Sequence, residues 1–160
     1  MLASENAVKW AMRLYPPLFF QRIWVTRFHK GFRGVDVRVK KSFLNTNHDH
    51  SIFGGTIYAA ADPFHPILFT HLLTLKGYNV KAWSRSSAIR YFKPAKTNMH
   101  FNIIITDAEI ADCEEQLKLN GKYRKSYQVE IFDKEDKLCA LVINEMYIRD
   151  LGRNINTKEA

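Results

Sequence analysis

The chain has 160 residues, of which 46% are hydrophobic and 25% are charged, and its formal net charge at pH 7 is +8. This size and composition are typical of one globular domain, and no apolar run of about 18 residues predicts a membrane span. The positive charge favours anionic partners. Because Lys and Arg are spread along the sequence without a long basic tract, it gives only weak support for nucleic-acid binding.

The first residues are predicted to form a helix. In residues 4–15 the apolar positions recur at helical spacing, and the charges among them argue against a signal peptide. Pro16 and Pro17 are expected to end this helix. The apolar and aromatic stretch 18–28 fits a short helix or a strand. Residues 1–30 are therefore interpreted as an N-terminal helical extension.

The next segment predicts a strand, a loop and a buried helix. Residues 35–40 alternate between valine and polar side chains, as in a half-buried strand, and residues 45–51 have the composition of a loop. Ser51 is a good N-cap, and the uncharged stretch IFGGTIYAAA after it predicts a helix buried on nearly every side. Asp62 and Pro63 interrupt that helix, and a second helical piece is expected to follow.

The remaining sequence predicts mainly strands. The stretch DAEIADCEEQLKLNG reads as a short acidic helix or an irregular excursion, and residues 151–160 as a frayed polar tail. The expected strands cover residues 80–92, 100–106, 123–133 and 138–150. A buried helix ahead of strands in series predicts an α+β fold with an antiparallel sheet wrapped around the helix. No linker divides the chain, so residues 1–160 are expected to form one domain.

An ordered set of residues resembles the hotdog-fold thioesterases, especially the phenylacetyl-CoA thioesterase type. That family has an asparagine in a loop, then His-Gly-Gly opening the central helix, then an aspartate near the helix middle. Asn47, Gly54-Gly55 and Asp62 have the same relative spacing here, and AIRYFKPA resembles the family's strand ending in a basic residue and proline. Phe53 stands where the family has the histidine. In this respect the sequence is closest to an uncharacterised branch of thioesterase-like hotdog proteins. The resemblance covers residues 35–148 and implies a curved antiparallel sheet around a central helix.

The glycine pair suits the polarisation of a thioester carbonyl. A helix N-terminus carries unpaired N–H groups and positive partial charge, and Gly54 and Gly55 leave a carbonyl room to approach them. Asp62 lies on the same helix face as Gly55 but roughly 10 Å further along the axis. Its carboxylate can therefore serve only the site of a neighbouring chain, across a twofold interface of antiparallel helices.

The resemblance implies the same shared site in a homodimer or a dimer of dimers. It combines the glycine end of one subunit with Asp62 of the other, which would act as general base or nucleophile. Asn47 would hold the attacking water or the thioester carbonyl. The family's usual leaving group is coenzyme A or an acyl-carrier phosphopantetheine arm, so coenzyme A is expected as part of the substrate and no separate cofactor is expected.

Three groups of residues complete the predicted site. The expected phosphate contacts are Arg90, Lys93 and Lys96. The expected lining of an acyl pocket is Phe53, Ile57, Tyr58, Phe64 and Trp83. No metal site is expected, because the loop residues His48, Asp49 and His50 have no distant third ligand. The cysteines, Cys113 and Cys139, have no metal-type spacing, and reduced thiols predict a cytoplasmic protein.

Structural explanations compete with these assignments. Asp62 and Pro63 have the sequence of an N-cap and a first helical residue, and the glycines could serve only close packing. His65 and His71 are expected to be satisfied interior or surface histidines. The first prediction is a thioesterase. The alternatives are a non-catalytic hotdog protein that binds acyl-CoA or a fatty acyl ligand, and a basic module that binds nucleic acid.

Overall fold

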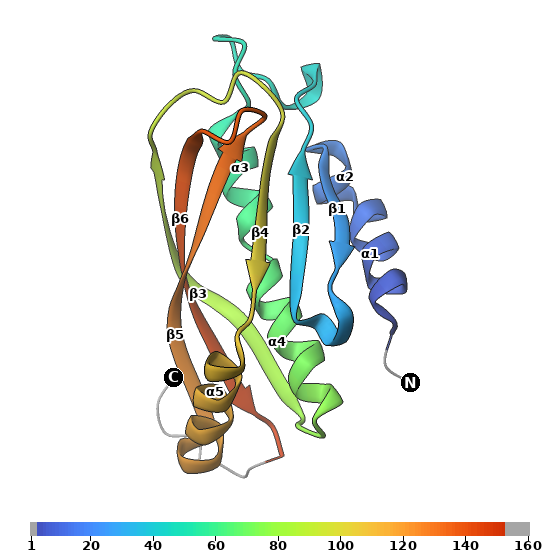
Figure 1. Cartoon of the computed structure of the whole chain (residues 1–160), viewed down its shortest axis with the longest axis vertical. Coiled ribbons are helices and arrows are strands. Elements are labelled where there is room, and N and C mark those ends of the chain that lie inside the picture. The colour runs from blue at the N-terminus through green and yellow to red at the C-terminus, as the bar shows by residue number, and fades with distance from the viewer. Residues whose placement is uncertain (1–2, 153–160) are drawn as a thin grey trace.

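One curved antiparallel sheet and a central helical rod make up most of the fold (Figure 1). The computed structural model describes residues 3–152. The sheet has six strands in the order β1-β2-β4-β5-β6-β3. The strands are β1 Ile23–Phe28, β2 Gly34–Val39, β3 Val80–Tyr91, β4 Met99–Ile104, β5 Lys122–Asp133 and β6 Leu138–Asp150. The helices are α1 Glu5–Leu14, α2 Pro16–Phe20, α3 Gly54–Ala61, α4 Phe64–Leu75 and α5 Asp107–Asn120, with short turns η1 Lys30–Phe32 and η2 Phe43–Asn45.

The hydrophobic core lies between the concave face of the sheet and the rod formed by α3 and α4. The alternation predicted for β2 is confirmed, because Val35, Val37 and Val39 are all buried. Leu68 and Phe69 on α4 are also fully buried. In Figure 1 the two helices, in green, follow one another along the inner side of the sheet. The pattern of valines thus fixes which face of β2 meets the rod.

The N-terminal extension contains both structures that stretch 18–28 allowed. Pro16 begins the short helix α2, as its fixed φ permits at a first helical turn, and β1 follows as an edge strand of the sheet. Helix α1 lies along this edge, where Arg13 Nε donates to the Val25 carbonyl at 2.7 Å. The Arg13 guanidinium also lies 4.5 Å from the Trp24 ring centroid. The β1 edge is therefore covered by the chain itself.

The central helix begins later than the sequence predicts. Helix α3 starts at Gly54, with Phe53 as N-cap, so the prediction that Ser51 caps it is wrong. The Ser51 amide and hydroxyl both donate to Asn47 Oδ1 instead, at 3.0 and 3.1 Å. The Ile52 amide donates to the Ala95 carbonyl at 2.8 Å. These bonds hold the segment against the loop before the helix can begin.

The Asp-Pro pair bends the helical rod without ending it. Asp62 and Pro63 both have right-handed helical dihedral angles, and the Asp62 amide still bonds to the Tyr58 carbonyl at 3.3 Å. The N-cap of α4 is Pro63, and no side chain caps that helix. The interpretation of Asp62 as an N-cap is therefore wrong. Its carboxylate makes no hydrogen bond or ion pair within residues 3–152.

Strand β3 forms the other edge of the sheet and changes face at a bulge. The pairing of β3 with β6 shifts register between Ser84 and Ser86. Before the bulge Ser84 faces the helices, since its hydroxyl reaches the Asp62 carbonyl at 3.5 Å. After it Ser87 and Tyr91 do so, because they bond to Asn144 and Gly54. The bulge thereby brings Tyr91 to the start of α3.

Candidate functional site

A cleft of about 400 Å³ lies at the N-terminal end of α3. It is formed where the loop before α3, the first turn of α3 and the end of β3 meet. Its lining residues are Asn47, Asp49, Ser51, Ile52, Gly54, Ile57, Tyr91, Phe92, Lys93, Pro94 and Ala95. The fold thus brings together Asn47, Gly54, Ile57 and Lys93, four of the residues that the sequence predicts for the site.

The N-terminus of α3 is left open at this cleft. Its first internal bond is from the Thr56 amide to the Phe53 carbonyl, at 2.9 Å, and Phe53 offers no side-chain cap. Within the described residues, the amides of Gly54 and Gly55 have no hydrogen-bond acceptor. Ser4 and Thr106, in contrast, cap α1 and α5 with their side chains. Unpaired amides and the helix dipole make this end electropositive.

Two aromatic rings lie against the glycines. The Tyr91 hydroxyl donates to the Gly54 carbonyl at 2.8 Å. A Cβ added at Gly54 would lie only 2.8 Å from the Tyr91 hydroxyl oxygen. A Cβ at Gly55 would collide with the ring of Phe53. The glycines therefore provide space for these rings as well as access to the amides. Tyr91 is a site residue that the sequence analysis missed, because the bulge that orients it is not visible in the sequence.

Asn47 orders the loop on one side of the cleft. Its Oδ1 accepts hydrogen bonds from the amides of Asp49 and Ser51, at 3.1 and 3.0 Å, and from the Ser51 hydroxyl. Its Nδ2 group makes no hydrogen bond to the described part of the chain. The side-chain oxygen is thus committed to the loop, whereas the amide nitrogen is available to donate to a ligand.

The three predicted phosphate contacts, Arg90, Lys93 and Lys96, differ in their surroundings. Lys93 is paired with Asp133, with Nζ 2.5 Å from Oδ2, and this bond, with backbone amides, lowers the pKa of Asp133 to about 2. The Arg90 guanidinium lies 5.5 Å from the Phe92 ring centroid. Lys96 is exposed, and its carbonyl accepts from Lys41 Nζ at 3.1 Å. Lys96 and Lys41 therefore add positive charge beside the cleft.

Asp62 lies too far along the rod to reach the open amides of its own chain. It is half-buried at the kink and separated from Gly54 by eight residues, about 12 Å of helix. A single chain thus holds the two halves of the predicted site apart. Asp62 has helical dihedral angles despite the kink. Its separation from Gly55 along the helix axis, on which the prediction of a shared site depends, is therefore that of a helix.

The residues predicted to line an acyl pocket are dispersed. Ile57 is buried and lines the cleft, while Phe53 and Tyr58 are exposed on α3. Phe64 is fully buried against Phe101. Trp83 packs on Tyr147 of β6, on the sheet face opposite to Ser84 and the helices. Phe64 and Trp83 therefore do not line the cleft, because helical packing and strand alternation direct them elsewhere.

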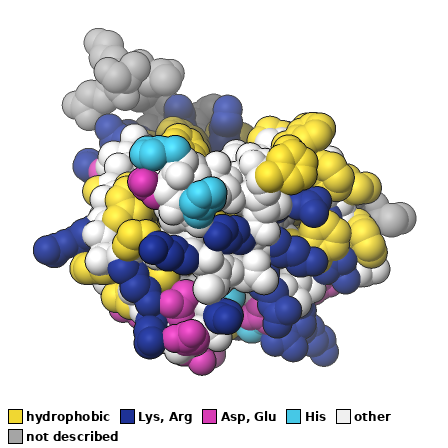
Figure 2. All heavy atoms as spheres, turned by 90° about the horizontal axis from the view of Figure 1, so that it is seen from above, with side chains coloured by type: hydrophobic (Ala, Val, Ile, Leu, Met, Phe, Trp, Pro, Cys, Tyr) yellow, Lys and Arg dark blue, Asp and Glu magenta, His cyan; other side chains and the backbone are white. Residues whose placement is uncertain are grey.

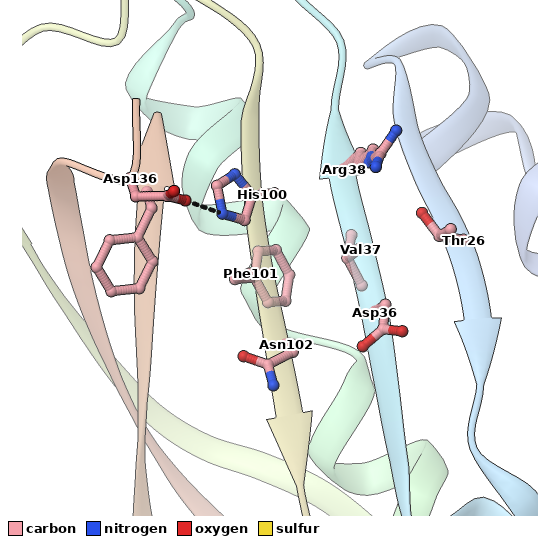
Figure 3. A pocket seen from close by; sticks show the side chains of 9 residues that line it. Thr26, Asp36, Val37, Arg38, His100, Phe101, Asn102 and Asp136 are labelled. Atoms are coloured by element: carbon pink, nitrogen blue, oxygen red, sulfur yellow. Dashed lines mark ion pairs between the residues drawn. The ribbon is translucent and has the colours of Figure 1, made fainter. Parts of the chain in front are cut away.

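A second cavity, of about 470 Å³, lies on the outer face of the sheet. Figure 3 shows its side chains along β1, β2 and β4, with Asp136 beside His100, and the ion pair between them measures 3.1 Å. Asp36 in this cavity is paired with Arg27 and His29. Asp36, His100 and Asp136 are therefore engaged with charged neighbours, whereas the unpaired backbone amides of a helix start, as found at α3, are not part of this cavity. Among the described residues no cluster of His, Cys, Asp or Glu has metal-site geometry.

Comparison with solved structures identifies the fold. The chain is similar to a Pseudomonas aeruginosa protein of unknown function called a probable thioesterase, with a TM-score of 0.77 at 16% identity over 94% of this chain and 98% of that one. It is also similar to a Haemophilus influenzae thioesterase, with 0.68 at 11% identity over 96% and 99% of the chains. The E. coli PaaI protein from the phenylacetic acid degradation operon gives 0.57 at 13% identity over 93% and 97%.

These likenesses confirm the fold that the sequence predicts: the chain has the hotdog fold, a curved antiparallel sheet around a central helix. It belongs to the family described as a domain of unknown function, DUF4442, whose model matches residues 4–148. No curated protein matches the sequence. Within the described residues, no helix is both long and apolar enough to cross a membrane.

Proposed function

We propose that this protein hydrolyses acyl-CoA or acyl-carrier thioesters. The observation that carries the proposal is the uncapped start of α3, where the amides of Gly54 and Gly55 have no acceptor and Gly54 lines a cleft. A thioester carbonyl placed there would accept hydrogen bonds from Gly54 and Gly55, and these would strengthen as the oxygen becomes an anion in the tetrahedral intermediate. Asn47 Nδ2 would be a further donor at the same wall.

The second half of the site would come from another copy of the chain. Strand β3 is a 12-residue edge strand, and no described element pairs with its outer edge, whereas α1 covers the β1 edge. Antiparallel pairing of β3 with a second β3 would satisfy its free backbone groups. It would also place the α3 rods side by side and antiparallel, which brings Asp62 of each copy toward the amides of the other.

The reaction then follows from the charges. As general base, Asp62 would take a proton from a water molecule whose oxygen attacks the thioester carbon. Collapse of the tetrahedral intermediate would break the C–S bond and release the thiol, which receives the proton. As nucleophile, the Asp62 carboxylate would attack the thioester carbon and form an anhydride as the C–S bond breaks and the thiolate leaves. Water would then hydrolyse the anhydride, which releases the carboxylic acid, restores the Asp62 carboxylate and supplies the proton that the thiolate takes up. Lys41 and Lys96 would attract the phosphates of the leaving group, and Ile57 would contact the acyl chain.

The test is thiol release from short, long and aromatic acyl-CoA esters. In Asp62→Asn we expect kcat to fall by about a hundredfold or more, while the free energy of unfolding changes by less than about 0.5 kcal/mol, since the carboxylate has no partner within the chain. Glu115→Gln, at an exposed carboxylate on α5, is the matched control and should leave kcat unchanged. Wild-type rates in Asp62→Asn would refute this role.

One observation favours a second function, the binding of acyl-CoA without hydrolysis. The rings of Tyr91 and Phe53 lie against the two glycines and narrow the approach to their amides. A pure binder would show no thiol release with any ester. It would instead be stabilised against heat by acyl-CoA, in the wild type and in Asp62→Asn alike. The two experiments together separate the hydrolase from the binder.

A further inference from the structure

The positive charge of the protein is concentrated in its N-terminal third. Residues 6–48 contain nine Lys and Arg residues and one acidic residue, Asp36. This segment therefore accounts for the whole net charge of +8, and the remaining residues are balanced, with fifteen basic and fifteen acidic side chains. A neutral body with a cationic N-terminal segment has an oriented attraction to anionic surfaces.

Backbone contacts gather part of this charge at one end of the molecule. The Lys40 amide donates to the Arg22 carbonyl at 3.0 Å, and Asn45 Nδ2 donates to the carbonyls of Gln21 and Lys40, at 2.7 and 3.0 Å. These bonds tie the end of α2, the end of β2 and the turn η2 into one surface. We call it the tip; its residues are Phe20, Arg22, Lys40, Lys41, Phe43 and Leu44.

The tip exposes large apolar side chains next to its cations. Phe43 is 89% exposed, Phe20 61% and Leu44 50%. Within the described residues Arg22 and Lys40 have no acidic partner, and the Lys41 ammonium group bonds only to the Lys96 carbonyl. Figure 2 views the molecule from this end and shows hydrophobic side chains beside a field of Lys and Arg. Exposed apolar groups of this size bordered by charge mark an interaction surface.

Exposed apolar and aromatic side chains are also found on α1 and at the start of α2. Trp10, Leu14 and Tyr15 are exposed, and Trp and Tyr are the side chains that favour the boundary between water and lipid headgroups. α1 is held in place by Arg13, whose guanidinium lies between the rings of Trp10 and Trp24 at 4.7 and 4.5 Å from their centroids. The aromatic side chains are therefore presented from a fixed support.

We propose that the tip docks on the surface of an anionic phospholipid bilayer. Phe20, Phe43 and Leu44 would insert among the headgroups, while the neighbouring cations contact lipid phosphates and carboxylates. Apolar side chains that protrude beside cations suit a bilayer interface, because the apolar groups can enter the membrane while the cations stay at its anionic surface. A nucleic-acid groove would instead recess its aromatic rings along a basic channel. A second copy docked tip to tip would bring the three cations of each tip, Arg22, Lys40 and Lys41, against three like charges. This inference does not depend on hydrolysis.

The test is sedimentation of the full chain with phosphatidylcholine vesicles, with and without phosphatidylserine. We expect binding only when phosphatidylserine is present and a steep loss of binding as salt rises. Phe20→Ser with Phe43→Ser, and separately Arg22→Gln with Lys40→Gln, should each weaken binding about tenfold or more. These side chains are exposed, so the fold should persist.

The matched control is Lys118→Gln with Leu119→Ser, one cation and one exposed apolar side chain on α5 at the opposite end of the molecule. It should bind vesicles like the wild type. Three results would overturn the proposal: no binding to phosphatidylserine vesicles, equal losses in the control variant, or tight binding to single-stranded oligonucleotides in place of vesicles. A smaller oligomer in the Phe20/Phe43 variant would instead assign the tip to a contact between copies.

Discussion

His65 has an unusual position for a titratable side chain. It is 2% exposed, its Nδ1 has no hydrogen-bond partner, and its ring stacks on Tyr127 with centroids 4.6 Å apart. Burial lowers the pKa of His65 to about 4, although the negative charge of Glu109 acts in the opposite direction. The histidine is interior, as expected, but it is not satisfied, because its neighbours are aromatic and apolar. The imidazole is therefore neutral in the folded protein at neutral pH.

This burial predicts a pH-dependent stability. The unfolded chain binds a proton at His65 below about pH 6.5, whereas the folded chain binds it only below about pH 4, so stability rises with pH across this window. Between pH 7 and pH 5 we expect His65 to cost about 2 kcal/mol. Urea unfolding of wild type and His65→Phe at both values measures it. An unchanged difference between the two pH values in His65→Phe would contradict the assignment.

Among the elements, α5 shows how a local signal decides a structure. The acidic stretch reads as a helix or an irregular excursion, yet it forms a 14-residue helix. Thr106 Oγ1 accepts from the Glu109 amide and the Glu109 carboxylate accepts from the Thr106 amide, which is a capping box. Gly121, with φ +65°, ends the helix. Ile110, Cys113 and Leu117 bury its inner face.

The cap makes a measurable contribution to stability. Thr106→Ala removes the side-chain acceptor at the start of α5, and we expect a loss of about 1 kcal/mol and a fall in Tm of about 2–4 °C. Thr106→Ser keeps the acceptor and should stay near the wild-type Tm. Calorimetry of the three proteins makes the comparison. Equal Tm values for the alanine variant and the wild type would show that packing of Cys113 and its neighbours alone sustains the helix.

For the whole molecule, the central matter is whether one site is built from two chains. Asp62 and Gly54 are held apart within a chain, and β3 leaves an edge that a second copy could complete. Because a twofold operation exchanges the two contributions, each site would take its amides from one chain and its carboxylate from the other. Mixed dimers can therefore distinguish a shared site from one confined to a single chain.

We predict complementation between two inactive variants. A heterodimer of Asp62→Asn and Gly55→Val chains, purified through two different tags, has one intact shared site and should recover about half of the wild-type activity. A heterodimer of wild type with a chain carrying both substitutions has none and should be inactive. Thiol release is the measurement in both cases. The reverse pattern would place the whole site within one chain, and a monomer in solution would remove the shared site altogether.

The sequence by itself determined the order and type of most elements. Valine alternation predicted β2, the two prolines marked the boundary of α1, and the resemblance of Asn47, the glycine pair and Asp62 to a known family predicted the hotdog fold. It also placed the open helix start at the glycines within three residues. These features depend on residues close in the chain, where side-chain period and backbone propensity act directly. The concentration of positive charge in residues 6–48 is also a property of the sequence. It becomes visible only when acidic residues are counted together with the basic ones, because basic residues alone are spread along the whole chain.

Only the tertiary structure decided which predicted residues meet. The sequence predicts that Asn47 binds the attacking water or the thioester carbonyl, but hydrogen bonds from Ser51 commit its side-chain oxygen to the loop. The β3 bulge brought Tyr91 to Gly54 and left Trp83 on the outer face. The kink at Pro63 kept Asp62 helical and without a partner in its own chain. The contact of Tyr91 with Gly54 joins residues 37 positions apart in the sequence, and their relative positions are fixed only when the sheet closes around the helix. The bonds of Asn47 and the conformation of Asp62 are local, but the sequence alone does not choose among the local conformations that these residues allow.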